Sequence, residues 1–192
     1  MNDTAAARIW NPARVLRVSA LFAGRVHADV ADYRPTHVVS LLDPAIDPAK
    51  VPAFGETRTL QRRFNDGDAP TAFPLTTDLM REIVGFLEDW SERLKAGGDA
   101  RLLVHCHMGA SRSTAVALVA LAVAHGESRE AVAFADLLRI TNKPWPNIHV
   151  VRLGDAILRR GGALIAELER YREANPNRLA AYRRLNNRRG LA

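Results

Sequence analysis

The sequence predicts an α/β fold in which a central, mostly parallel sheet of about four to five strands is flanked by helices. Three observations support this prediction. Short Val-, Leu- and Ile-rich runs alternate with helical patterns up to His105, only helical patterns follow it, and 47% of the 192 residues are hydrophobic. We therefore expect a single domain over residues 1–175. A basic C-terminal segment, 176–192, follows, and partial disorder is one expectation for it.

The first elements follow a β-α-β order. Residues 15–19 and 36–42 are short apolar runs typical of buried strands, and 20–33 is predicted to be the connecting helix. Three prolines mark 43–52 as a loop, and alternating polarity predicts a third strand over 57–64.

A polar break, NDGDAPTAFP, separates the third strand from a long predicted helix. Apolar residues recur at helical spacing over 75–95, and Gly97 and Gly98 end the pattern. Residues 101–105 then form the fourth predicted strand. Further helices are predicted over 112–125, 129–141, 148–159 and 162–173.

The cysteine count and the lengths of the apolar runs indicate the cellular location to expect. A single cysteine cannot form an internal disulfide, so the chain gives no sign of an oxidising environment, and we expect a cytoplasmic location. We identify no targeting segment. The longest apolar run, 114–124, has about half the length of a membrane span, so we expect a buried helix and no transmembrane segment.

The net charge of +6 belongs to the C-terminal part. Residues 152–192 hold ten arginines against four acidic residues, whereas the rest of the chain balances seventeen against seventeen. A solvated helical face is the simplest interpretation. Contact with nucleic acid, an acidic protein or an anionic membrane surface is the alternative.

The stretch LLVHCHMGASRSTA, 102–115, contains the main candidate functional residues. Residues 106–111 form a predicted turn from strand to helix at the carboxyl edge of the sheet, where α/β folds bind ligands. Backbone N–H groups and the helix N-terminus favour an anion there and favour the nucleophilic thiolate of Cys106. Gly109 permits close backbone approach, and Arg112 can hold two phosphate oxygens.

This loop, HCHMGASRS, resembles the H-C-x5-R-S signature of the cysteine-dependent protein tyrosine phosphatases, and its H-C-x-x-G-x-S-R-S form is similar to the dual-specificity branch. The resemblance implies that Cys106 attacks phosphorus, that Arg112 holds the phosphoryl group and that Ser113 hydrogen-bonds the sulfur. It also implies that His105 positions the loop and favours the thiolate. The other predicted substrate-binding residues are His107, Met108, Gly109, Ala110 and Ser111.

The resemblance also implies an aspartic general acid on a separate loop upstream of the cysteine. In RRFNDGDAP, Asp66 directly follows the predicted strand and matches that position better, with Asp68 as the alternative acid. A third interpretation makes both aspartates only turn formers.

The resemblance covers roughly residues 14–160 and extends to the segment RITNKPWPNIHVV, which is similar to the R-x-x-x-x-P-N segment of dual-specificity enzymes. Because the aspartate precedes the cysteine, the low-molecular-weight phosphatases and arsenate reductases fit less well. The arrangement also looks like the small bacterial tyrosine-phosphatase-like proteins.

These observations predict a phosphomonoester hydrolase, in particular a tyrosine or dual-specificity protein phosphatase without a cofactor or metal. The loop contains no lysine, which favours phosphoproteins, while the basic C-terminal part keeps phosphoinositides or RNA as alternatives. Two other functions stay open, a phosphate-recognising module with little turnover and rhodanese-like sulfur transfer. Ser111 can also be interpreted as a simple helix cap. A metal site at His105 and His107 is not favoured, because the sequence has no second cluster that would complete four ligands.

Overall fold

The computed structural model describes residues 10–66 and 72–188. These residues form a four-stranded, all-parallel sheet in the order β1-β4-β2-β3, which confirms the predicted fold class. The strands are β1 Leu16–Ala20, β2 His37–Leu42, β3 Arg58–Arg63 and β4 Leu102–Cys106. Because all four strands are parallel, their carboxyl ends meet at one edge of the sheet.

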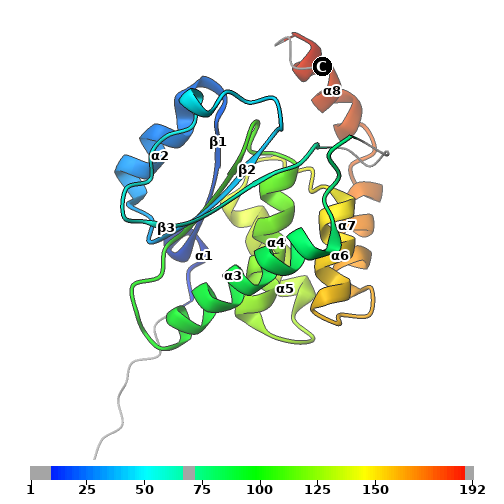
Figure 1. Ribbon diagram of the computed structural model, residues 1–192. Coiled ribbons are helices and arrows are strands. Elements are labelled where there is room, and N and C mark those ends of the chain that lie inside the picture. The colour runs from blue at the N-terminus through cyan, green and yellow to red at the C-terminus, as the bar shows by residue number, and fades with distance from the viewer. Residues whose placement is uncertain (1–9, 67–71, 189–192) are drawn as a thin grey trace, which may run out of the picture.

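Helices cover both faces of the sheet (Figure 1). The shorter α2, Arg25–Tyr33, covers one face, and α3, Thr77–Lys95, lies with most later helices on the other. The remaining helices are α1 Pro12–Val15, α4 Arg112–His125, α5 Glu130–Ile140, α6 Ile148–Ile157, α7 Ala163–Glu173 and α8 Arg178–Arg188, with short 3-10 turns at η1 Phe22–Gly24 and η2 Pro48–Lys50.

Helix α4 lies at the centre of the larger core. Its residues from Arg112 to Val123 are all buried, because the sequence is apolar around the whole helix and neighbours surround it. Gly126 follows at φ +85° and ends the helix. The prediction that 114–124 forms a buried helix is therefore confirmed. No helix in the described ranges has both the length and the hydropathy needed to cross a membrane.

Three local features differ from the expected boundaries. The helix predicted over 20–33 is broken, because Ala23 (φ 56°) and Gly24 (φ 68°) adopt left-handed conformations between η1 and α2. The four-residue α1, capped by Asn11, has no counterpart among the predicted elements. Cys106 is the last residue of β4 and not the first residue of the following turn.

The C-terminal segment contains helix α8, which lies beyond the carboxyl edge of the sheet (Figure 1). Its first residue, Arg178, places its guanidinium 5.5 Å from the ring centroid of Tyr171 in α7 and donates a hydrogen bond to the Tyr171 hydroxyl. This helix is not among the elements predicted from the sequence. The domain boundary at 175 stays a prediction.

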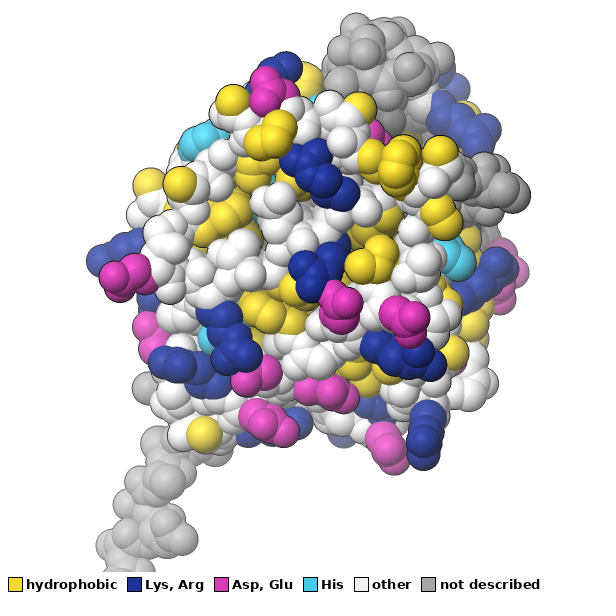
Figure 2. All heavy atoms as spheres, in the orientation of Figure 1, with side chains coloured by type: hydrophobic (Ala, Val, Ile, Leu, Met, Phe, Trp, Pro, Cys, Tyr) yellow, Lys and Arg dark blue, Asp and Glu magenta, His cyan; other side chains and the backbone are white. Residues whose placement is uncertain are grey.

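The face of the molecule that carries α3 mixes charges of both signs (Figure 2). Arg58 pairs with Asp89 at 2.8 Å, Arg81 pairs with Asp78 at 2.6 Å, and Arg62 pairs with Glu82. Opposite charges therefore lie beside one another across this face, in contrast to the arginine excess of the C-terminal part.

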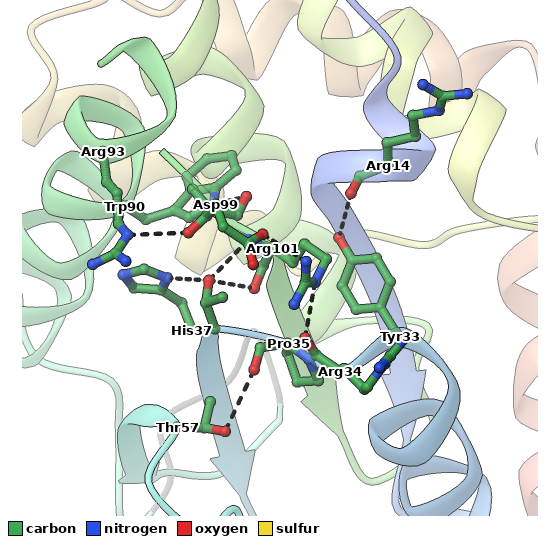
Figure 3. A network of polar contacts seen from close by, with 12 residues as sticks. Arg14, Tyr33, Arg34, Pro35, His37, Thr57, Trp90, Arg93, Asp99 and Arg101 are labelled. Carbon is green, nitrogen blue, oxygen red and sulfur yellow. Dashed lines mark hydrogen bonds and ion pairs between the residues drawn. The ribbon is translucent and has the colours of Figure 1, made fainter. Parts of the chain in front are cut away.

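A polar network closes the edge where the strands begin (Figure 3). The hydroxyl of Thr36, just before β2, accepts a hydrogen bond from Arg101 N at 2.9 Å and donates to Arg101 O at 3.3 Å. Trp90 Nε1 donates to Ala100 O at 3.1 Å, and Arg101 Nε donates to Arg34 O at 2.8 Å. These bonds fasten the starts of β2 and β4 to each other and to α3.

Candidate active site

The thiol of Cys106 lies at the carboxyl end of β4, which is paired on both sides by β1 and β2. The residue is 1% exposed and its thiol is free. Gly109 N donates a hydrogen bond to Sγ at 3.3 Å, and the Ser113 hydroxyl lies 3.1 Å from Sγ. Donors from both the loop and helix α4 therefore converge on the sulfur, an arrangement that stabilises negative charge.

The loop 107–111 is held by main-chain hydrogen bonds from two sides. On one side, Leu21 N donates to Cys106 O and Phe22 N donates to His107 O, both at 2.9 Å. On the other, Trp145 N donates to Ala110 O at 2.9 Å. The path of the loop is thus fixed by segments that follow β1 and precede α6.

Gly109 satisfies two requirements at once. Its φ of +69° lies in the left-handed region, and a Cβ on it would approach Ser19 O to 2.8 Å, closer than real Cβ contacts. The glycine therefore lets the loop turn tightly against β1 while its N–H faces the sulfur.

Arg112 is the first residue of α4, and its side chain is 3% exposed. Its Nη1 donates to Phe64 O at 2.6 Å, and its Nε lies 3.7 Å from Asp66 Oδ2. The guanidinium is therefore anchored by the segment that follows β3 and faces the carboxylate of Asp66.

The structure brings Asp66 to the loop that follows Cys106. Asp66 Oδ1 accepts hydrogen bonds from the Ser111 hydroxyl at 2.7 Å and from Asn147 Nδ2 at 3.0 Å. The side chain is 27% exposed. Asp68, the alternative acid, lies outside the described residues. The interpretation of Asp66 as only a turn former does not account for these contacts across the fold.

The interpretation of Ser111 as a helix cap is wrong. Ser111 occupies the N-cap position of α4, but its hydroxyl donates to Asp66 and makes no capping hydrogen bond within the described part of the chain. The hydroxyl of Thr114 bonds to this turn instead, because its Oγ1 lies within donating distance of Ala110 O, at 2.6 Å, and of Ser111 O, at 2.9 Å. The hydrogen bond from Ser111 to Asp66 thus joins the loop that follows Cys106 to the segment that follows β3.

His105 lies beside Cys106 on β4 and points to the opposite face of the sheet, where its ring packs 5.7 Å from that of Phe54. It is fully buried, and neither ring nitrogen has a hydrogen-bond partner of normal geometry among the described residues. Burial lowers the pKa of His105 to about 4, and the Cys106 backbone offsets only part of that shift. The ring is neutral at pH 7 and brings no positive charge near Cys106.

The remaining loop residues are partly buried. Burial and the neighbouring Arg112 lower the pKa of His107, whose ring meets that of Phe22 edge-on at 6.5 Å. Met108 and Ala110 are half-buried in the same loop. Within residues 10–66 and 72–188, no group of three or more His, Cys, Asp or Glu side chains is arranged to hold a metal ion.

Asn147 is not among the site residues predicted from the sequence, although it belongs to the Pro-Asn pair of the segment RITNKPWPNIHVV. Helix α7 supports the segment before it: Tyr171 Oη donates to Pro144 O at 2.8 Å and Arg172 Nη2 donates to Pro146 O at 2.9 Å. The arginine of the same motif, Arg139, pairs with Asp136 at 3.0 Å.

No model of a protein family and no curated protein matches the chain. Solved structures do match. Human DUSP28 has a TM-score of 0.53 and 21% identity, over 85% of this chain and 95% of its own. The Cydia pomonella PTP-2 phosphatase has a TM-score of 0.53 and 23% identity, over 76% and 87%. PTPMT1 has a TM-score of 0.51 and 16% identity, over 82% and 98%. The chain therefore has the fold of the dual-specificity and tyrosine phosphatases.

Proposed function

We propose that the protein hydrolyses phosphomonoesters through a cysteinyl-phosphate intermediate on Cys106. The observation that carries the proposal is the convergence of Gly109 N–H and the Ser113 hydroxyl on Cys106 Sγ, in a loop that Arg112 and Asp66 adjoin. A nucleophile, an anion-binding loop, a guanidinium and a carboxyl group are the parts that displacement at phosphorus requires. The shared fold supports the same reaction class but does not by itself assign it.

In the first step, the thiolate of Cys106 attacks phosphorus and the bond to the leaving oxygen breaks. Arg112 turns its donors from Phe64 O and Asp66 toward two phosphoryl oxygens, which a planar guanidinium can bind together. Asp66, protonated, gives its proton to the leaving oxygen. The leaving group departs as a neutral alcohol.

In the second step, a water molecule attacks phosphorus, Asp66 accepts its proton, and the sulfur–phosphorus bond breaks. The Ser113 hydroxyl, 3.1 Å from Sγ, donates a hydrogen bond to the departing thiolate. Inorganic phosphate leaves and the starting protonation states return. Because Asp66 acts as an acid and then as a base, the pH dependence of turnover is bell-shaped.

For the substrate, we propose phosphoproteins, cleaved in the manner of a tyrosine or dual-specificity phosphatase. Arg112 is the only permanently charged side chain between positions 106 and 112, and burial and the neighbouring Arg112 lower the pKa of His107, which disfavours its charged form. A loop with one cation fits a single phosphoryl group better than a polyphosphorylated headgroup. A reactive thiol also requires a reducing compartment, so we propose a cytoplasmic location.

Phosphoinositides and RNA are the alternative substrates, because the C-terminal part is rich in arginine and because one structure of the same fold is PTPMT1 in complex with PI(5)P. The alternative function is recognition of phosphate with little turnover, which the same loop also supports.

The test is hydrolysis of p-nitrophenyl phosphate by the wild type, Cys106→Ser and Asp66→Ala, with thermal unfolding of each protein. We expect turnover by the wild type and a loss of about 10⁴-fold or more in kcat for Cys106→Ser, with its Tm nearly unchanged. Trapping of a radiolabelled phosphoenzyme at low pH identifies the intermediate. A panel of phosphotyrosine, phosphothreonine and phosphoinositide substrates then decides the substrate class.

Turnover that persists in Cys106→Ser contradicts the cysteinyl-phosphate mechanism. A wild type that binds vanadate but does not turn over supports the phosphate-binding module. Consumption of thiosulfate with cyanide supports sulfur transfer instead.

A further inference from the structure

We propose that Asn147 is a positioning residue that holds the carboxyl group of Asp66 in its proton-donating orientation, with Oδ2 as the oxygen that carries the proton. This inference rests on the proposed function, because it assigns a role toward the general acid. It concerns a side chain located 81 residues from Asp66 in the chain.

Both polar atoms of the Asn147 side chain have partners. The residue is 5% exposed, its Oδ1 accepts a hydrogen bond from Val150 N at 3.0 Å, and its Nδ2 donates to Asp66 Oδ1 at 3.0 Å. Exchange of the two atoms would place an oxygen against a carboxylate and an amino group against an N–H. The orientation of the amide is therefore fixed.

The segment that contains Asn147 is also bonded to the nucleophile loop. Asn147 N donates to Ser111 O at 3.4 Å, next to the bond between Trp145 N and Ala110 O. On the opposite side, the Arg172 guanidinium lies 4.9 Å from the ring centroid of Trp145. Asn147 is thus presented to Asp66 from the same framework that holds the loop of Cys106.

The two oxygens of Asp66 differ in their surroundings. Oδ1 accepts hydrogen bonds from the Ser111 hydroxyl and from Asn147 Nδ2, so it is occupied as an acceptor. Oδ2 receives no hydrogen bond from any described residue and faces Arg112 Nε at 3.7 Å. Because Arg112 is the proposed phosphoryl ligand, Oδ2 is the oxygen beside the leaving group. The donors on Oδ1 fix the carboxyl plane that aims Oδ2 there.

The structural and the positioning roles of Asn147 use different atoms, which makes them separable. Capping of α6 uses only Oδ1, and serine caps helices about as well as asparagine. Asn147→Ser therefore keeps a cap but loses the donor to Asp66, whereas Asn147→Ala loses both. Asn142→Ser, at an exposed position of the same segment, is the matched control.

The experiment compares kcat for phenyl phosphate, whose poor leaving group needs the acid, with kcat for p-nitrophenyl phosphate, whose leaving group needs it little. We expect Asn147→Ser to lower kcat about tenfold on phenyl phosphate and less than about threefold on p-nitrophenyl phosphate. In an Asp66→Asn background the same substitution has no further effect. Asn142→Ser behaves as the wild type on both substrates.

Equal losses on the two substrates, or a loss that adds to that of Asp66→Asn, overturn the proposal and leave Asn147 as a structural cap. The ratio of the two kcat values does not depend on the folded fraction, so a destabilised variant still gives an answer. If Cys106→Ser retains turnover, the proposed function itself fails. If Cys106→Ser is inactive and Asp66→Asn selectively slows phenyl phosphate while Asn147→Ser does not, only this inference fails.

Discussion

The two edges of the sheet differ in how completely their polar groups are hydrogen-bonded. Where the strands begin, side chains and main chain satisfy one another, as in the bonds of Thr36 with Arg101 and of Trp90 with Ala100. Figure 3 shows this network, in which Arg101 also bonds to Arg34. Where they end, the buried ring nitrogens of His105 have no hydrogen-bond partner of normal geometry among the described residues, and Nε of Arg112 has only the carboxylate of Asp66 at 3.7 Å. These buried, incompletely hydrogen-bonded groups lie at the edge that also holds the free thiol.

This difference teaches which edge stabilises the fold and which one is available for chemistry. Satisfied polar groups contribute to the free energy of unfolding, while buried unsatisfied ones cost about 1–3 kcal/mol each. Such costs are concentrated at functional sites and are offset by the rest of the fold. Substitutions at the two edges should therefore separate stability from turnover.

The largest expected effect is at the reactive edge. Arg112→Lys keeps the positive charge but loses the fork that binds two phosphoryl oxygens, so we expect kcat/KM for p-nitrophenyl phosphate to fall about 10²–10³-fold. The Tm should change little. Arg139→Lys, whose side chain is 70% exposed, is the control and should stay within about twofold of the wild type. Nearly full activity of the Arg112→Lys variant would mean that Arg112 does not hold the phosphoryl group.

The next effect concerns acid stability at the same edge. The pKa of His105 is lowered from 6.5 to about 4 by burial, so between those values the unfolded state binds the proton and the folded state does not. The lowered pKa of His105 therefore contributes to the free energy of unfolding. This contribution is fully present above pH 6.5 and is lost as the pH falls toward 4. It amounts to about 3 kcal/mol.

Urea unfolding of the wild type and His105→Asn from neutral pH to about pH 4 measures this contribution. We expect the wild type to lose about 3 kcal/mol more than the variant over that interval. His37 and His107 also have lowered pKa values, but they are present in both proteins and cancel in the difference. Parallel stability curves would show that His105 is not buried in its neutral form.

The smallest effect is expected at the opposite edge. Thr36→Val keeps the side-chain shape but removes the acceptor of Arg101 N, so we expect a loss of about 1–2 kcal/mol in unfolding free energy. The kcat of the folded enzyme should not change. Arg93→Gln, which removes an exposed hydrogen bond to Asp99 O, serves as the control and should cost about 0.5 kcal/mol or less. A fall in kcat for Thr36→Val would break the separation between the two edges.

Much of the fold could be predicted because its signals are local. The apolar stretch before Gly126 predicts α4 with its observed bounds, Val- and Leu-rich runs predict β1, β2 and β4, and alternating polarity predicts β3, each strand within about one residue. The break at Ala23 could not be foreseen, because alanine rarely adopts a positive φ and the surrounding fold imposes it. Helix α8 has no strong apolar periodicity, so its residues indicate a helix only weakly.

The candidate site likewise combines residues that the local sequence predicts with contacts that it does not predict. Cys106, Gly109, Arg112 and Ser113 belong to one continuous motif, and their geometry follows from a strand, a tight turn and a helix. Asp66 is predicted as the acid from its place after a strand, in the loop where the family resemblance implies an acid. The contacts of Asn147 and Ser111 with Asp66 join segments 81 and 45 residues apart, and only the packing of the whole fold brings them together.

The strand order β1-β4-β2-β3 has a consequence for how the molecule opens. Cys106 ends an inner strand, whereas Asp66 follows β3, which pairs with β2 alone. Amide protons of inner strands generally exchange with solvent only through large-scale opening, and those at the margins exchange through local fraying. We therefore expect the amides of β4 that precede Cys106 to exchange more slowly than those of β3, which precedes Asp66.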